Sequence, residues 1–303
     1  MLSMQLDLLI GLGPLKVGEA ALEESVACGV VLYETPPRDV QRLARSVKAA
    51  AAAAGVSCRF LAIDNSDRLD AENFAALTGP ILLGEFVPNE GNLGFGKGHN
   101  RLMARAFGAG ADHYLALNPD GFLHPDALRA LLVQSALHQD FALIEARQFP
   151  NEHPKIYDPE SLVTPWCSGA CLMIPKRLHA EIGGFDNGFF MYCEDVDYSW
   201  RARLVDAPCV IAADAFFHHD ILDRPQSDSA RWHMAMSMQR LLSKWANGDM
   251  PPKLAASLAK MLSDAPMAIR RTGSSTGSPL GNPRCADVAD FKHFFGFAPF
   301  RWT

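Results

Sequence analysis

The chain has 303 residues and a mass of 33.1 kDa, with 49% hydrophobic and 20% charged residues, which is the composition of an ordinary globular protein with a sizeable core. Its net charge is -6: residues 1–239 carry 19 Lys and Arg against 30 Asp and Glu, whereas residues 240–303 carry 9 against 4. An acidic body argues against a nucleic-acid partner, because phosphate backbones need a basic footprint.

Apolar runs and amphipathic stretches alternate from Cys28 onward, after an N-terminal extension (1–27) to which we assign no chemistry. Strands are expected at 29–33, 58–64, 81–89, 113–118, 141–147 and 209–220. Helices are expected at 40–53, 101–110, 125–137, 194–204 and 231–262. This alternation predicts a doubly wound α/β fold with a parallel sheet. The expected catalytic domain spans 28–225, followed by a helical segment (226–271) and a linker with an aromatic, basic tail (272–303).

Polar features follow several of these strands. Ligands of doubly wound sheets bind beyond the carboxyl ends of the strands. Asp64, the glycine segment 91–98 and Asp120 all come directly after a predicted strand. We therefore expect them on one rim of the sheet.

The glycine segment, GNLGFGKG, nearly matches the phosphate loop GxxxxGK[ST], but Gly98 stands where that loop has its metal-binding hydroxyl. This disfavours an ATPase or GTPase. The dinucleotide fingerprint GxGxxG does not fit either. Two interpretations remain: a turn that lets a helix pack close to a strand, or a backbone-lined loop for part of a nucleotide. Lys97 is either a phosphate contact or a solvated surface residue.

Asp120 is a candidate metal ligand. The turn Asn118-Pro119-Asp120 ends a strand, and a carboxylate in this position suits Mg²⁺ or Mn²⁺ bridging a diphosphate. An Asx-type turn without a metal is the alternative. His218 and His219 follow the last strand on the same rim. Either completes the metal site, with His219 favoured, or both are buried structural imidazoles.

Three carboxylates, Glu194, Asp195 and Asp197, lie within four residues at the start of a predicted helix. The helix dipole keeps carboxylates ionised there, and an ionised carboxylate accepts a proton at neutral pH. A catalytic base is therefore one interpretation. Helix capping with a surface pair between Asp197 and Arg201 is the other.

Taken in order, these motifs resemble the family 2 glycosyltransferases, and among them the rhamnosyltransferase-like branch. The resemblance covers residues 28–220. It rests on VVLYETPPRDVQRLARS (30–46), IDNSD (63–67), NEGNLGFGKGHN (89–100), LNPDG (117–121) and CSGACLMIPKRLHAEIGGFDNGFFMYCEDVDYSWRAR (167–203). Two departures concern the donor base: Glu34 stands where relatives usually have Asn, and Gly98-His99 replaces a commoner small pair.

The resemblance implies a GT-A fold, with one nucleotide-binding α/β domain and a mixed, mainly parallel sheet, here followed by a C-terminal helical extension. It also implies inverting transfer of a sugar from a nucleoside diphosphate sugar. In that family the first strand and the IDNSD turn cradle the base and ribose, and we expect the glycine segment to line the nucleotide. The residues so assigned to the donor are Tyr33, Glu34, Asp64, Asn65, Gly94, Gly96, Lys97, Asn100 and Asn118.

The same resemblance implies roles for the remaining motifs. The NPD turn stands in for the DxD motif, so Asp120 is expected to bind Mg²⁺ or Mn²⁺. The ED pair supplies the base, which maps to Asp195 with Glu194 beside it. The SGA segment and the GGF turn shape the pocket between donor and acceptor. The residues assigned to this pocket are Ser168, Gly169, Gly184, Phe185 and Asp197.

We therefore expect an inverting, metal-dependent glycosyltransferase of cell-envelope polysaccharide synthesis, with dTDP-L-rhamnose as the leading donor and a glycan or lipid-linked acceptor. The metal would neutralise the leaving diphosphate, and Asp195 would deprotonate the acceptor hydroxyl. A catalytically silent nucleotide-sugar-binding protein on the same fold and a nucleotidyltransferase are the alternatives.

The cysteines and the N-terminus bear on location. Seven cysteines are scattered without a Cys-x-x-Cys pair, which fits a reducing cytosol. Asp7 interrupts the N-terminal apolar run, so no signal peptide is expected, and no run is long enough to span a membrane. We expect a cytoplasmic protein. Its basic, aromatic tail either contacts the inner face of the plasma membrane or forms a homodimer contact.

Overall fold

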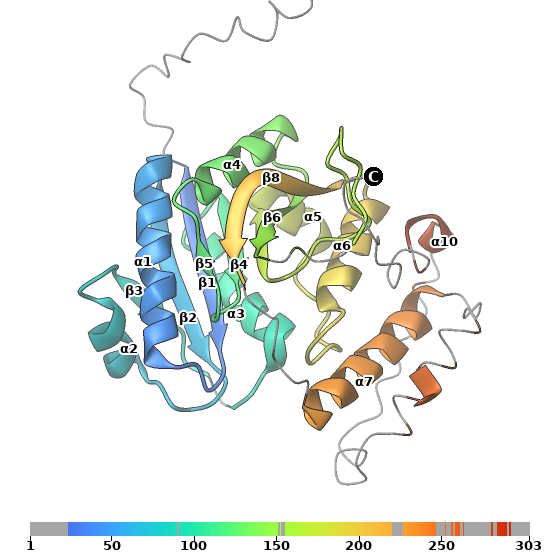
Figure 1. Ribbon diagram of the computed structural model, residues 1–303, viewed down its shortest axis with the longest axis horizontal. Coiled ribbons are helices and arrows are strands. Elements are labelled where there is room, and N and C mark those ends of the chain that lie inside the picture. The colour runs from blue at the N-terminus through green and yellow to red at the C-terminus, as the bar shows by residue number, and fades with distance from the viewer. Residues whose placement is uncertain are drawn as a thin grey trace, which may run out of the picture.

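A computed structural model of the chain describes residues 24–89, 91–150, 152, 155–219 and 227–246, together with residues 252, 256, 258–260, 263, 280, 284–289 and 291. Most of these residues belong to one mixed sheet with helices on both faces (Figure 1). The expected fold class, an α/β fold with a mainly parallel mixed sheet, is confirmed.

The sheet has eight strands in the order β3-β2-β1-β4-β7-β6-β8-β5. The strands are β1 (Ser25–Leu32), β2 (Ser57–Asp64), β3 (Gly84–Phe86), β4 (His113–Leu117), β5 (Phe122–Leu123), β6 (Leu143–Phe149), β7 (Cys171–Pro175) and β8 (Cys209–His218). Strands β3, β2, β1 and β4 run parallel, as do β6 and β8. Strand β7 is antiparallel to both of its neighbours, and β5 is antiparallel to β8.

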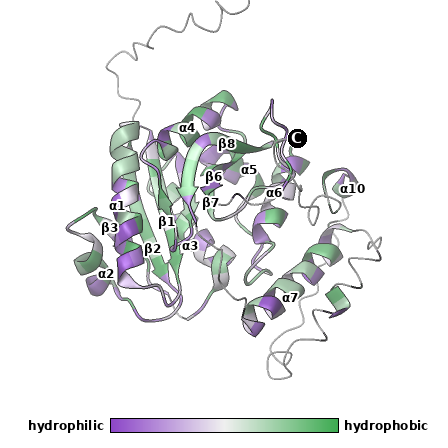
Figure 2. Cartoon of the chain, viewed as in Figure 1, coloured by the Kyte–Doolittle hydropathy of each residue, from purple (hydrophilic) through white to green (hydrophobic). Residues whose placement is uncertain are grey.

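Two apolar clusters hold helices against the two faces of the sheet. One face is covered by α1 (Pro37–Ala54), α2 (Ala71–Thr78) and α4 (Ala127–Leu137), and the other by α3 (Gly94–Gly108), α5 (Lys176–Ile182) and α6 (Glu194–Leu204). In Figure 2 the central strands are largely hydrophobic, whereas α1 and α2 carry hydrophilic stretches. Burial of the apolar side chains between the helices and the sheet stabilises the packing of these layers.

A third cluster attaches the C-terminal helix α7 (Asp228–Trp245) to α6. Trp200 of α6 meets Trp245 of α7 edge to face, with 5.4 Å between ring centroids. The short helix α10 (Cys285–Val288) joins the same cluster. Most of the helix expected beyond residue 246 and most of the tail lie outside the described residues. In the described part of the chain, no helix is long and apolar enough to cross a membrane.

Several boundaries differ from the expected ones. The strand expected at 81–89 is only the three residues of β3, and the glycine segment is already helical from Gly94. Strand β1 begins at Ser25, so the expected N-terminal extension contributes to the sheet. Strands β5 and β7 and helices α2 and α5 had no sequence prediction.

The topology places the candidate residues at one rim. Strand β1 lies between β2 and β4, and such a switch point opens a crevice at the carboxyl ends of the strands. Asp64 ends β2, and the NPD turn follows β4. The rim expected from the sequence therefore exists.

Candidate active site

Asp120 and His219 lie together where β4 and β8 end. His219 Nε2 is 3.2 Å from Asp120 Oδ1 and 3.2 Å from Asn118 Nδ2. The short strand β5, which follows the NPD turn, pairs antiparallel with β8. This pairing brings a turn and a histidine that are far apart in sequence into contact.

These side chains fit a divalent cation. The ring N–H at His219 Nδ1 donates to Oε1 of the buried Gln148 at 2.9 Å, which leaves the Nε2 lone pair facing Asp120. A lone pair beside a carboxylate oxygen is stabilised by a cation. Among the residues that the structure describes, no group of three or more His, Cys, Asp or Glu side chains is arranged to hold a metal. Mg²⁺ at nucleotide sites commonly takes one or two carboxylates together with phosphate oxygens and water.

His218 points elsewhere. Its ring stacks on Phe122, with 4.4 Å between the centroids and 14° between the planes. Neighbouring side chains of a strand face opposite sides, so only one of the two histidines can reach the NPD turn. The structure brings His219 there.

Asp195 is held at the start of α6 by two backbone amides. The Gly169 N–H donates to Oδ2 and the Val196 N–H to Oδ1, each at 2.9 Å. The chain enters α6 through Tyr192 and Cys193, whose φ angles are 72° and 63°. Two successive non-glycine residues in the left-handed region carry backbone strain, which concentrates at functional sites.

Burial acts on both carboxyl groups of the acidic pair. Glu194 is buried, and its burial together with the charge of Asp195 raises the pKa of Glu194 to about 8. Burial also raises the pKa of Asp195, while the amides of Gly169 and Val196 lower it. Burial therefore favours the neutral form of Glu194, while the two amides favour the charged form of Asp195.

Residues 168–170 join the two ends of the site. While the Gly169 N–H donates to Asp195, the Ala170 carbonyl accepts from the Asn118 N–H at 2.9 Å. The NPD turn and the acidic pair thus flank one short backbone segment, which runs directly into β7. Ser168 is buried, and a Cβ on Gly169 would lie 3.0 Å from the Phe95 ring.

Asp64 and Asn65 build the rim beside the expected nucleotide site. The Asn65 amide donates to the Gly94 carbonyl at 3.1 Å, and its oxygen accepts from Asn89 at 2.8 Å. The buried Asp64 carboxylate caps the turn that follows by accepting from Ser66, Arg68 and Leu69.

Tyr33 and Glu34 lie at the open end of β1. The Tyr33 side chain is 57% exposed. Glu34 has a φ of 51° and pairs with Arg68 at 2.7 Å. Both side chains are accessible to a ligand at the rim.

The glycine segment packs α3 against the loop before α6. A Cβ on Gly94 would lie 2.0 Å from the Phe190 carbonyl oxygen, and the Phe95 N–H donates to the same oxygen at 2.9 Å. A Cβ on Gly96 would lie 3.0 Å from the Phe185 Cβ. Close packing is therefore one use of these glycines, and the exposed Lys97 directly follows Gly96.

Asn100 holds the GGF turn. Its oxygen accepts from the Phe185 N–H at 2.7 Å and its nitrogen donates to the Phe185 carbonyl at 2.8 Å. A Cβ on Gly184 would lie 2.3 Å from the Asn100 oxygen, so this close approach requires glycine. The Asn100 amide and the buried Phe185 both serve the position of this turn.

Asp197 is fully buried and joins α6 to α7. Its carboxylate accepts from Arg201, Trp245 and Lys244, at 3.0, 2.9 and 2.6 Å. With no exposed surface, its carboxylate serves contacts inside the protein. The expected surface pair with Arg201 exists, but it is part of this internal network.

Sequence reasoning missed several residues around the site: Asn89, Glu145, Gln148, Lys155 and Ser199. Ser199 accepts from the Cys167 N–H at 2.9 Å and donates to the Asp195 carbonyl at 2.7 Å, so it ties α6 to the segment before β7. A signal was present for Glu145, since a charged residue inside the apolar run FALIEAR needs a partner when buried.

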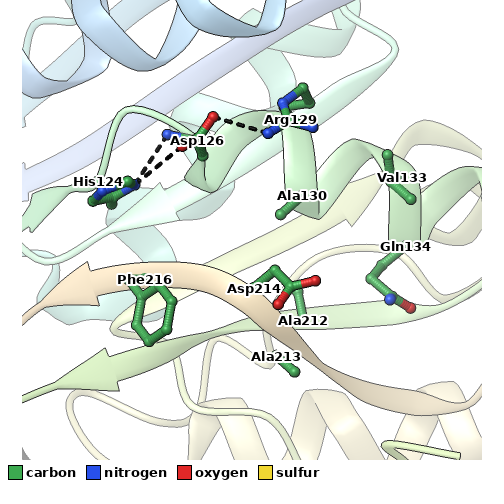
Figure 3. Close-up of a pocket in the computed structure, with 10 residues that line it drawn as sticks. All are labelled: His124, Asp126, Arg129, Ala130, Val133, Gln134, Ala212, Ala213, Asp214 and Phe216. Carbon is green, nitrogen blue, oxygen red and sulfur yellow. Dashed lines mark hydrogen bonds and ion pairs between the residues drawn. The ribbon is translucent and has the colours of Figure 1, made fainter. Parts of the chain in front are cut away.

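A separate pocket lies between α4 and β8 (Figure 3). It has a volume of about 370 Å³ and contains none of the predicted site residues. His124, Asp126 and Arg129 line one side of it, with Asp214 and Phe216 opposite. Apart from the buried Ala212, its lining residues are exposed or half-buried, whereas Glu194 of the acidic pair is buried.

Comparison with known proteins supports the same family as the motifs. No protein-family model matches the chain. Over 191 residues the chain is 27% identical to the rhamnosyltransferase WbbL of Escherichia coli, a match that spans 50% of this chain and 71% of WbbL. Over 99 residues it is 33% identical to an N-acetylglucosaminyl-diphospho-decaprenol L-rhamnosyltransferase of Mycobacterium tuberculosis, a match that spans 31% of each chain.

Among solved structures, the fold is similar to that of the mannosyltransferase PcManGT from Pyrobaculum calidifontis, in complex with GDP-Man and Mn²⁺. The TM-score is 0.58 and the identity 14%, over 90% of this chain and 76% of that one. This likeness establishes the GT-A fold. The chain therefore has the fold of GT-A glycosyltransferases, and part of its sequence is similar to two rhamnosyltransferases.

Proposed function

We propose that the chain transfers a sugar, with inversion and with the help of Mg²⁺ or Mn²⁺, from a nucleoside diphosphate sugar to a hydroxyl group of a glycan or lipid-linked acceptor. The observation that carries this proposal is the segment 168–170, which is bonded on one side to the NPD turn and on the other to Asp195. Displacement at an anomeric carbon needs both groups: a cation at the NPD turn would neutralise the leaving diphosphate, and Asp195 would deprotonate the attacking hydroxyl.

Asp120 and His219 would hold the cation, with Asn118 beside them. A divalent cation at this place neutralises charge on the departing diphosphate. Gln148 fixes the His219 ring with Nε2 toward Asp120, which orients the ligand before a donor binds. Mn²⁺ bound to PcManGT supports this choice of cofactor.

Asp195 would act as the base. Its raised pKa makes it a better proton acceptor than an exposed aspartate while it remains the charged member of the pair. The amides of Gly169 and Val196 fix both of its oxygens. Glu194, protonated beside it, would limit the negative charge at the site without competing for the acceptor proton.

The donor and the acceptor are proposed from the relatives. Both are named rhamnosyltransferases, so dTDP-L-rhamnose is the leading donor, and the name of the mycobacterial protein favours a lipid-linked diphosphate acceptor. Tyr33, Glu34 and Lys97 are the exposed side chains near the rim that would meet the nucleotide. We assign catalysis to residues 28–225 and place the enzyme in the cytoplasm.

A transfer assay tests the proposal. The protein is incubated with UDP-, dTDP- and GDP-sugars, Mn²⁺ and a polyprenyl diphosphate sugar, and product is detected by mass spectrometry. Asp195→Asn should lower turnover by at least about 100-fold while nucleotide affinity stays near that of the wild type. Wild-type turnover in this variant would show that Asp195 is not the base. Release of pyrophosphate from an NTP and a sugar phosphate would indicate a nucleotidyltransferase instead.

The basic tail is proposed to touch a membrane that carries the acceptor. Deleting residues 272–303 should reduce co-sedimentation with anionic liposomes. Unchanged sedimentation together with loss of a dimer in light scattering would assign the tail to self-association.

A further inference from the structure

A buried ion pair lies directly behind the acidic pair and is not used in the proposed reaction. Glu145 of β6 pairs with Lys155, and their side chains are 3% and 1% exposed. The Lys155 ammonium also donates to the Trp166 carbonyl at 2.7 Å and lies 4.5 Å from the centre of the Trp166 ring. Every contact of the pair therefore leads toward the segment before β7.

The pair is bonded to the backbone that holds Asp195. Glu145 Oε2 accepts from the Ser168 N–H at 2.7 Å, and the next amide along the chain, that of Gly169, donates to Asp195. The two amides belong to successive planar peptides that meet at the Ser168 Cα, so once the Ser168 amide is fixed only the two backbone torsions of Ser168 remain to place the Gly169 amide. One residue further, Ala170 accepts from Asn118 of the NPD turn.

Stability alone does not explain an ion pair at this position. Replacing a buried pair with apolar side chains of similar size is often neutral or stabilising, because the desolvation of two charges is costly. Breaking such a pair by removing one partner is strongly destabilising. A buried ion pair can also orient a neighbouring group, and here that group is the Ser168 amide, which donates to Glu145.

We propose that Glu145 and Lys155 are positioning residues: they fix the backbone of residues 168–170 and thereby set the Asp195 carboxylate and the NPD turn relative to each other. This inference rests on the proposed function for its catalytic consequence. The Lys155 ammonium offsets the cost of burying the charged Glu145 carboxylate. Glu145 in turn accepts the hydrogen bond of the buried Ser168 amide. A displacement of about 1 Å at a reacting group costs about 100-fold in rate.

Two double variants separate this role from a structural one. Glu145→Gln with Lys155→Met removes both charges but keeps an oxygen that accepts from the Ser168 amide. Glu145→Leu with Lys155→Met removes the acceptor as well. Asp126→Asn with Arg129→Gln, at an exposed pair on α4, is the matched control. Each protein is measured for thermal stability, for kcat and donor KM, and for hydrogen exchange at the Gly169 amide without ligand.

The Leu/Met variant should melt at a lower temperature than the Gln/Met variant, because the buried Ser168 N–H has lost its acceptor, and should keep an unchanged donor KM, with kcat about 100-fold lower. The Gln/Met variant should recover most of that loss. Gly169 should exchange about tenfold faster in the Leu/Met variant than in the Gln/Met variant. A Leu/Met variant with wild-type kcat, or equal exchange in the two variants, would overturn the proposal. If the wild type transfers no sugar, the proposed function fails, and the exchange rates still decide whether the pair holds the segment.

Discussion

Glu194 and Asp195 are neighbours in sequence, yet their surroundings give them different protonation states. Asp195 accepts from two amides, which favour its charged form, whereas Oε2 of Glu194 is buried without a hydrogen-bond partner. The charge of one carboxylate also disfavours ionisation of the other. The environment of Glu194 thus favours its neutral form, and the amides around Asp195 favour its charged form.

Glu194→Gln should change how stability depends on pH. The pKa of Glu194 is about 8 in the folded protein against an ordinary 4.5, so the folded chain binds more protons than the unfolded chain between these values. The stabilisation is fully present below pH 4.5 and is lost as the pH rises through 8. The variant, whose amide does not ionise, should lose less stability than the wild type between pH 5 and pH 8.

Urea unfolding at both pH values measures this difference. The substitution Glu160→Gln on an exposed side chain is the control and should follow the wild type. Parallel pH curves for the wild type and Glu194→Gln would mean that Glu194 is charged in the folded protein.

Gly94→Ala and Gly91→Ala form a matched pair at the glycine segment. Both residues have positive φ, 76° and 83°, but a Cβ on Gly94 meets the Phe190 carbonyl, whereas Gly91 has open space. Gly91→Ala should cost about 1–2 kcal/mol from the left-handed conformation alone. Gly94→Ala adds a steric term and should cost about 2–5 kcal/mol. Chemical denaturation measures both, and equal losses would show that the contact with Phe190 yields easily.

At the level of elements, α7 is bonded both to α6 and to the loop that precedes it. Lys244 bridges Asp186 at 2.8 Å and Asp197 at 2.6 Å, which connects the loop before α6 to α6 itself. Ser237 donates to the Met191 carbonyl of the same loop at 2.7 Å. The helix therefore supports the strained entry to the acidic pair.

Lys244→Met should destabilise the protein by about 3–5 kcal/mol, because it leaves the fully buried Asp197 and the partly buried Asp186 with less compensation. Lys48→Met, at an exposed position of α1, is the control and should leave stability unchanged. Urea unfolding followed by tryptophan fluorescence provides the measurement, since Trp245 lies in this contact. A loss no larger than that of the control would show that α7 is held by its apolar face alone.

Most long elements could be predicted from the sequence, because their hydrophobic periodicity is strong. The apolar runs of β1 and β2 and the amphipathic α1 illustrate this. Helix α2 escaped prediction since only eight residues lie after its Asp70 cap. Strand β7 escaped because CLMIP is a short apolar run whose direction depends on the tertiary fold. The helical start at Gly94 depends on contacts with Phe190 and Phe185, which no local pattern encodes.

In the candidate site, too, residues within local motifs could be predicted, whereas residues that act through tertiary contacts could not. Asp120, Asp195 and Asn118 belong to compact motifs with a fixed spacing, so their mutual proximity could be inferred once the family resemblance was recognised. Glu145 and Lys155 could not be assigned, since they reach the site through a hydrogen bond to backbone that lies 23 residues further along the chain from Glu145. The roles of the site residues stay predictions.

For the whole molecule, the reversal of direction at β7 is what assembles the site. The parallel strands β2, β1 and β4 form the rim proposed to bind the nucleotide, and the antiparallel β7 places residues 168–170 beside the end of β4. Helix α6 then packs on the same side as α3, with its acidic N-terminus at this segment. In the proposed reaction, donor and acceptor would therefore meet where the parallel half of the sheet adjoins the antiparallel strand.

Binding of a cation and a nucleotide across this boundary should stabilise the entire fold. A nucleoside diphosphate at 100 times its Kd, with Mn²⁺, contributes about 2.7 kcal/mol, or a rise in melting temperature of about 5 °C. EDTA should remove that rise.

His219→Ala should lose the Mn²⁺-dependent part of the rise in melting temperature, because its ring faces Asp120, whereas His218→Ala should keep it, because that ring stacks on Phe122. Differential scanning fluorimetry measures the Mn²⁺-dependent rise in melting temperature for both variants, so that each histidine serves as the control for its neighbour. A full Mn²⁺-dependent shift in His219→Ala would mean that the cation binds elsewhere.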